Sequence, residues 1–165
     1  MNYLFCGFLI LIGVLFRLIP HAPNFTPILT IALMSGLYIK NKWAILLPVL
    51  IMLVSDLFIG SHITAPWVYG SILVIFFIGR LIKNTVLNIL LCSVASSLVF
   101  FLVTNFGVWF SGGYAYSFEG LVLCYVMAIP FFKNTLISTV LFSAIFYSLH
   151  YFINISSLKY QKNKI

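Results

Sequence analysis

The chain is dominated by runs of apolar residues that are each about as long as a lipid bilayer is thick. Apolar residues make up 63% of its 165 residues, whereas Asp, Glu, Lys and Arg together make up 7%. A soluble domain of this size carries about 25% charged residues. A helix needs roughly 20 apolar residues to cross the hydrocarbon layer. The sequence therefore predicts a single all-α membrane domain over residues 1–165, embedded in the lipid bilayer.

The apolar runs predict six transmembrane helices and one shorter apolar piece. The second helix follows the proline-rich segment 20–27, in which Pro27 suits the first helical position and Thr26 suits the N-cap. Pro130 predicts a helix break after the shorter piece. We place the helices near 2–19, 27–40, 43–61, 66–83, 85–104 and 133–154, with a re-entrant or partly inserted segment near 118–131.

The positions of the basic residues indicate the orientation, because Lys and Arg accumulate in cytoplasmic loops. The loops at 20–26, 61–66 and 105–118 contain no Lys or Arg. The alternate loops and the C-terminal end hold Lys40, Lys42, Arg80, Lys83, Lys159, Lys162 and Lys164. Both termini are therefore predicted to be cytoplasmic, which a seventh full span at 118–131 would prevent. Because these residues account for most of the net charge of +7, we predict no nucleic-acid partner.

Two opposite charges lie within the apolar runs, Arg17 in the first and Asp56 in the third. A lone charge at the bilayer centre costs roughly 2.5–3.5 kcal/mol. We therefore expect the two side chains to face each other or a polar cavity. Two roles remain open for the pair: an ion pair that only holds the helices together, and part of a binding site.

Most other polar residues near the apolar runs fall at the predicted outer ends of the helices. Irregular segments at 20–26 and 105–118 would cap this region. A stripe of Ser93, Ser97 and Thr104 in the fifth helix favours helix packing. The predicted ligand-binding residues are Arg17, His21, Asn24, Asp56, His62, Trp67, Asn105, Trp109, Lys133 and Asn134.

Catalytic and metal-binding patterns are absent from the sequence. It contains no metalloprotease HExxH, no GxSxG and no glycine-rich phosphate loop. We therefore predict that the protein is not an enzyme and has no metal or cofactor. Cys6, Cys92 and Cys124 are interpreted as buried small hydrophobic residues. A membrane enzyme remains an alternative, and it predicts that Asp56 contacts Glu119 or His21.

Four segments carry a resemblance to a known family: RLIPHAPNFTP (17–27), SDLFIG (55–60), TNFGVWF (104–110) and AIPFFKNTL (128–136). The chain resembles an uncharacterised family of small bacterial membrane proteins with the motif R-x-x-P-H-x-P-N-F-T-P. That family is distantly similar to the substrate-binding S components of energy-coupling-factor vitamin transporters. The resemblance implies six helices, a pocket near the outer surface and a multi-pass location in the bacterial plasma (inner) membrane.

Many S components dock to an energising transporter module through an AxxxA pattern in the first span. The corresponding segment here, CGFLILIG (6–13), lacks that pattern, so this partner stays open. The leading expectation is a binding and uptake protein for a small water-soluble molecule such as a vitamin or precursor. The alternatives are a structural or assembly membrane protein, with Arg17 and Asp56 as an ion pair of the bundle, and a small integral-membrane enzyme.

Overall fold

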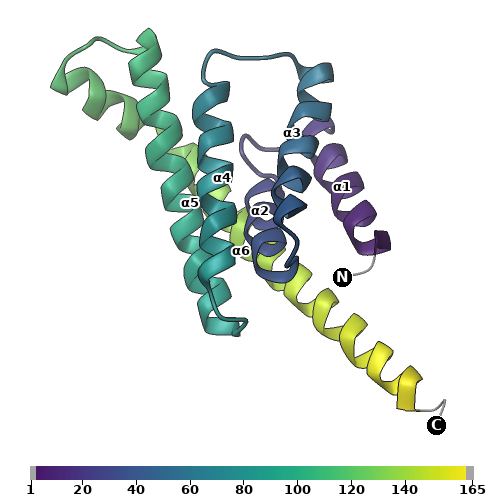
Figure 1. Cartoon of the computed structure of the whole chain (residues 1–165). Helices are drawn as coiled ribbons and strands as arrows, with labels where there is room; N and C mark the ends of the chain where they lie inside the picture. The colour runs from purple at the N-terminus through teal and green to yellow at the C-terminus, as the bar shows by residue number, and fades with distance from the viewer. Residues whose placement is uncertain (1–2, 163–165) are drawn as a thin grey trace.

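The computed structural model describes the backbone of residues 3–162 and the side chains of residues 7–153. The side chains of Cys6, Lys159, Lys162 and Lys164 lie outside this description. Within it, the regular structure is entirely helical, which confirms the predicted all-α class (Figure 1). The elements are α1 (Tyr3–Leu18), α2 (Ile28–Tyr38), the 3₁₀ turn η1 (Lys42–Ile45), α3 (Leu46–Ile59), α4 (Ala65–Leu81), α5 (Val86–Val108), the π-helical turn η2 (Trp109–Gly113) and α6 (Phe118–Lys162).

Three helical stretches are long and apolar enough to cross a membrane: Lys42–Ile59, Val86–Gly113 and Phe118–Ile153. The remaining helices are apolar but shorter, with 10–17 residues each within the described part of the chain. The outside of the bundle is rich in exposed Leu, Ile, Val and Phe, whereas the buried polar side chains are serines and threonines. This distribution is typical of a protein whose outer surface faces lipid.

Helix α2 lies at the centre of the bundle and contacts α1, α3, α4, α5 and α6. Its residues Ile28–Gly36 are all buried. With 11 residues it is about 16 Å long, which is roughly half the thickness of the hydrocarbon layer. The prediction of Thr26 as its N-cap is wrong, because Pro27 occupies that position and no side chain caps the helix. The irregular segment 19–27 therefore leads directly into the buried helix.

Helices α2 and α4 approach each other closely at two glycines, Gly36 and Gly79. A Cβ atom added to Gly36 would lie 2.2 Å from the Phe76 carbonyl oxygen, and one added to Gly79 would lie 2.0 Å from the Leu33 carbonyl oxygen. Larger side chains would push the two backbones apart. Small residues at such crossings are the usual means of tight helix packing in membranes.

The prediction of a helix break at Pro130, with a separate segment near 118–131, is wrong. Helix α6 continues through Pro130 and has 45 residues. Its first part packs along α5: the Tyr125 hydroxyl donates to the Leu102 carbonyl oxygen at 2.8 Å, and the Cys124 thiol donates to the Asn105 carbonyl oxygen at 3.3 Å. These contacts hold the chain in helical form on the N-terminal side of the proline. The sequence pattern does not predict them.

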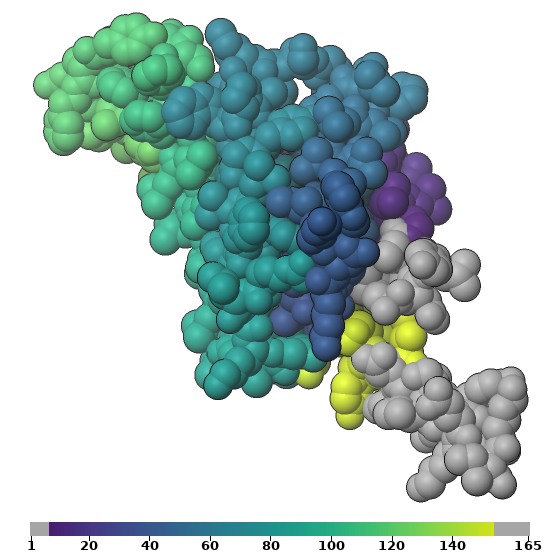
Figure 2. All heavy atoms as spheres, in the orientation of Figure 1, coloured from purple at the N-terminus to yellow at the C-terminus, as the bar shows by residue number. Residues whose placement is uncertain are grey.

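At about 68 Å, α6 is longer than a bilayer is thick, and it runs obliquely behind the other helices (Figure 1). The region 105–118, expected to be irregular, is partly helical, since α5 reaches Val108 and η2 follows it. Together with the start of α6 it forms a lobe that protrudes from the body of the molecule, at the upper left in Figure 2.

The two ends of the bundle differ in their charged residues. At one end, the Arg80 guanidinium donates to the carbonyl oxygens of Ile39 and Asn41, and the Tyr38 hydroxyl donates to Asn84 Oδ1 at 3.1 Å. The α2–α3 connection, with Lys40 and Lys42, and the α4–α5 connection, with Lys83, therefore lie together. The connections at 19–27 and 60–64, which contain no Lys or Arg, lie at the opposite end with the end of α5.

Candidate functional site

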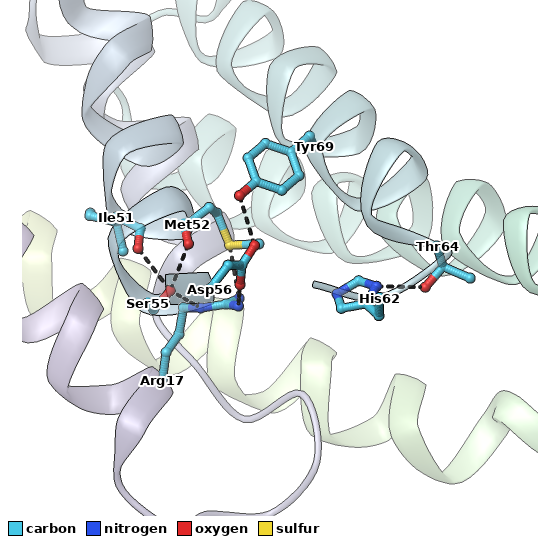
Figure 3. Close-up of polar contacts among 8 residues, drawn as sticks. All are labelled: Arg17, Ile51, Met52, Ser55, Asp56, His62, Thr64 and Tyr69. Carbon is cyan, nitrogen blue, oxygen red and sulfur yellow. Dashed lines mark hydrogen bonds and ion pairs between the residues drawn. The ribbon is translucent and has the colours of Figure 1, made fainter. Parts of the chain in front are cut away.

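The predicted meeting of Arg17 and Asp56 is confirmed. Arg17, in the last turn of α1, donates from Nη2 to Asp56 Oδ1 at 2.5 Å. Its Nε donates to Ser55 Oγ at 2.5 Å and its Nη1 contacts the Met52 sulfur at 2.8 Å. The Tyr69 hydroxyl on α4 donates to the second Asp56 oxygen at 2.7 Å (Figure 3). The pair thus joins α1, α3 and α4.

The local geometry of α3 explains this arrangement. Met52, Ser55 and Asp56 are three and four residues apart, so they lie on one face of the helix. The Ser55 hydroxyl donates to the carbonyl oxygens of its own helix, at Ile51 and Met52, and its oxygen can therefore accept from Arg17. The side chains of Arg17 and Asp56 are only 14% and 12% exposed, so the charges depend on each other rather than on water.

Two adjacent hollows lie at the same end of the bundle as this pair. The larger hollow has a volume of about 290 Å³ and lies between α4, α5 and α6 and the segments 19–27 and 60–64. The smaller hollow has a volume of about 180 Å³ and reaches Arg17 and the first turn of α2. The two share the residues Asn24, Val68, Phe100 and Thr135. They form one polar-lined region at the end of the bundle whose connections lack Lys and Arg.

Half of the predicted site residues line these hollows. Arg17, His21 and Asn24 line the smaller hollow, and Asn24, His62 and Asn105 line the larger one. His21 and His62 also have local partners: His21 Nδ1 lies 2.6 Å from the Ile19 carbonyl oxygen, and His62 Nδ1 lies 2.9 Å from Thr64 Oγ1.

Asp56 is not among the residues lining either hollow, and it lies next to Arg17. Its described hydrogen bonds go to Arg17 and Tyr69, not to the Glu119 or His21 that the enzyme alternative predicted.

The other four predicted residues lie outside the lining of both hollows. Trp67 packs its ring on Phe106 and Phe110. Trp109 donates from Nε1 to the Ala115 carbonyl oxygen at 3.0 Å and so closes the turn between α5 and α6. Lys133 is exposed on α6.

Asn134 contacts the irregular segment rather than a hollow. Its Nδ2 donates to the Pro23 carbonyl oxygen at 3.1 Å. One turn along α6, the Ser138 hydroxyl lies 3.5 Å from the Asn24 carbonyl oxygen. Asn24 itself has a φ of 63°, an uncommon value for a residue other than glycine. Helix α6 therefore holds the segment 19–27 in place.

Several lining residues were not among the predicted ligand-binding residues. Thr64, Thr104 and Thr135 supply hydroxyls to the larger hollow, and four phenylalanines supply apolar walls: Phe100, Phe101, Phe131 and Phe132. Two pairs, at 100–101 and 131–132, occur in the sequence near Asn105 and Asn134. Their position near the outer ends of two predicted helices, 85–104 and 133–154, was the available signal, although phenylalanine is common throughout the chain.

The packing interpretation of the serine stripe on α5 is confirmed for Ser93 and Ser97. Both are fully buried. The Ser93 hydroxyl lies 2.8 Å from Ser143 Oγ on α6, which in turn lies 3.3 Å from Thr30 Oγ1 on α2. These hydroxyls connect three helices below the hollows. Thr104, at the outer end of the stripe, instead lines the larger hollow.

Comparison with known proteins places the chain at family level. A protein-family model matches residues 1–162, and its description is a family of unknown function, DUF6580. No curated protein and no solved structure matches the chain. The match covers nearly the whole length, including both hollows and the Arg17–Asp56 pair. The chain therefore belongs to this family of unknown function.

Proposed function

We propose that this protein binds a small water-soluble molecule in the outer half of a bacterial inner membrane and takes part in its uptake, in the manner of an S component. The supporting observation is the pair of polar-lined hollows over the start of α2. Ligand sites in proteins commonly have volumes of about 300–1,000 Å³ and a few polar groups in apolar walls. The larger hollow, with about 290 Å³, lies at the small end of this range.

The irregular segment 19–27 supports a functional role for the hollows in a membrane protein. Backbone that is not helical is tolerated at membrane depth only where protein covers it or a water-filled cavity adjoins it. Here the segment enters the bundle to meet the short, buried α2, and Asn24 from this segment lines both hollows. The arrangement is suited to a cavity that admits polar molecules from one side.

The distribution of Lys and Arg supports an outward-facing cavity. The connections beside the hollows contain none of these residues, whereas those at the opposite end do. The positive-inside rule then assigns the hollows to the outer leaflet, with six spans and cytoplasmic termini. Labelling by a membrane-impermeant thiol reagent tests this assignment: in a cysteine-free background, Ser61→Cys should react in intact cells and Asn84→Cys only in lysed cells.

Arg17 serves the proposed site as a fixed part of its wall, held by Asp56 from outside the lining. Arg17 lines the smaller hollow, and its salt bridge ties α1 to α3, while Tyr69 adds α4. A structural role and a binding role are therefore combined in one group of side chains. The segment 19–27, held to α6 by Asn134, is the part that would open to admit the ligand.

Binding by the purified protein tests the proposal directly. Val68 lines both hollows, so Val68→Trp should fill part of the space. Val74 lies on the same helix and is 47% exposed, which makes Val74→Trp the matched control. Titration calorimetry in nanodiscs with a panel of water-soluble vitamins and their precursors should give binding by wild type and Val74→Trp but not by Val68→Trp. A panel that binds none of the three proteins would contradict the proposal.

A further inference from the structure

The lining of the larger hollow carries information about the charge of its ligand. Among the described residues that line it there is no Lys, Arg, Asp or Glu, and His62 is the single titratable side chain. An anion placed there would lose part of its water shell without meeting a permanent opposite charge, which is unfavourable. Arg17 lies at the smaller hollow and is already neutralised by Asp56.

The polar groups that α5 and α6 present to the larger hollow include hydrogen-bond acceptors with free lone pairs. The Thr104 hydroxyl donates to the Phe100 carbonyl oxygen at 2.7 Å, and the Thr135 hydroxyl donates to the Phe131 carbonyl oxygen at 3.0 Å. Each hydroxyl oxygen keeps lone pairs that can accept, but its single proton is already used.

Asn105 differs in part: one N–H of its Nδ2 donates to the Phe101 carbonyl oxygen at 2.7 Å, and the second N–H remains. Its side-chain oxygen is an acceptor with two lone pairs. A ligand that presents N–H groups would therefore find partners on both α5 and α6. The side-chain amides of Asn24 and Asn105 also offer N–H donors, to which the ring nitrogens of such a ligand would bind.

The apolar walls favour a flat ligand. Phenylalanines from α5 and α6 face the larger hollow, and the rings of Phe101 and Phe132 lie 4.8 Å apart between centroids. Aromatic rings pack well against other flat rings in offset or edge-on arrangements. The volume of about 290 Å³ is sufficient for one or two fused rings with substituents.

We propose that the larger hollow recognises a planar heteroaromatic amine without negative charge, held through its N–H groups by Thr104, Thr135 and Asn105. This inference rests on the proposed function and adds the chemical class of the ligand. It assigns Thr104 and Thr135, which were not among the predicted ligand-binding residues, the role of specificity-determining residues.

Fragment binding measured by ligand-observed NMR tests the inference with defined probes. Adenine and aminopyrazine are the amines, purine and pyrazine are the same rings without the amino group, and benzoate and nicotinate are aromatic anions. We expect each amine to bind more tightly than its parent ring, and the two anions to bind most weakly. Val68→Trp should weaken all binding, and Val74→Trp should not.

The variants of Thr104 separate recognition from shape. Thr104→Val keeps the shape and removes the acceptor oxygen, so the amines should bind roughly three- to tenfold more weakly while the parent rings are unaffected. Thr104→Ser keeps the oxygen and should retain the preference for the amines. An equal loss of affinity for the amines and for the parent rings would assign Thr104 a merely structural role and overturn the inference.

Two outcomes distinguish this inference from the proposed function. If benzoate and nicotinate bind best and Val68→Trp abolishes their binding, the hollow is a binding site but the proposed ligand class is wrong. If no probe distinguishes wild type from Val68→Trp, the ligand class is again wrong, and the vitamin panel then decides the proposed function independently.

Discussion

Removal of the negative charge at Asp56 should destabilise the protein strongly. Asp56→Asn keeps the size of the side chain but leaves Arg17, which is 14% exposed, without its opposite charge. Breaking a buried ion pair by removing one partner costs about 3–5 kcal/mol. The bonds from Arg17 to Ser55 and Met52 remain, so we expect a loss near the lower end, about 3 kcal/mol.

Two companion variants define how much of this loss is due to charge. Tyr69→Phe removes one hydrogen bond to Asp56 and no charge, and it should cost about 1 kcal/mol. The double variant Arg17→Gln/Asp56→Asn leaves no lone charge, so it should be more stable than either single variant. The free energy of unfolding can be measured in mixed micelles by titration with sodium dodecyl sulfate, followed by tryptophan fluorescence.

The double variant also separates the two roles of the pair. If the pair lines the site as well as holding the helices, the folded double variant should bind the ligand more weakly than wild type. Unchanged binding would leave the pair with a structural role alone. The reasoning about coupled charges fails if Asp56→Asn costs less than Tyr69→Phe, or if the loss in the double variant equals the sum of the losses in the single variants.

Further predictions concern the packing of α2 and the segment above it. Gly79→Ala would place a Cβ 2.0 Å from the Leu33 carbonyl oxygen, and it should lower the free energy of unfolding by about 3 kcal/mol or more in the same assay. Gly70→Ala, on the same helix, meets no atom within 4 Å and should be neutral or stabilising. Equal stability of the two variants would contradict the close crossing. Asn134→Ala removes the bond to the Pro23 carbonyl oxygen and should speed hydrogen exchange in residues 19–27 without unfolding α6; unchanged exchange would show that Asn134 does not hold the segment.

The sequence predicts the structure best where the lipid environment restricts where a side chain can lie. A charge within an apolar run has little chance of reaching water, so Arg17 and Asp56 could be expected to meet, and they do. The order of the helices also followed from the apolar runs and their boundaries. The central position of α2 was not predicted, because a short apolar helix has the same sequence pattern whether it faces lipid or protein.

Long-range packing accounts for the differences. Pro130 predicts a helix break from local chemistry, but contacts between α5 and α6 extend the helix across it. The direction in which Trp67 and Trp109 point depends on neighbours that are distant in the sequence, and both pack away from the hollows. Thr104 could not be distinguished from a packing hydroxyl, since serines and threonines of similar spacing fill the core.

Native mass spectrometry of the protein released from its own membrane tests the central claim most directly. We predict that wild type and Val74→Trp carry a small molecule of the same mass, and that Val68→Trp, which fills part of the space in the two hollows, carries none. The same mass on all three proteins, or on none of them, would contradict a ligand site at this position.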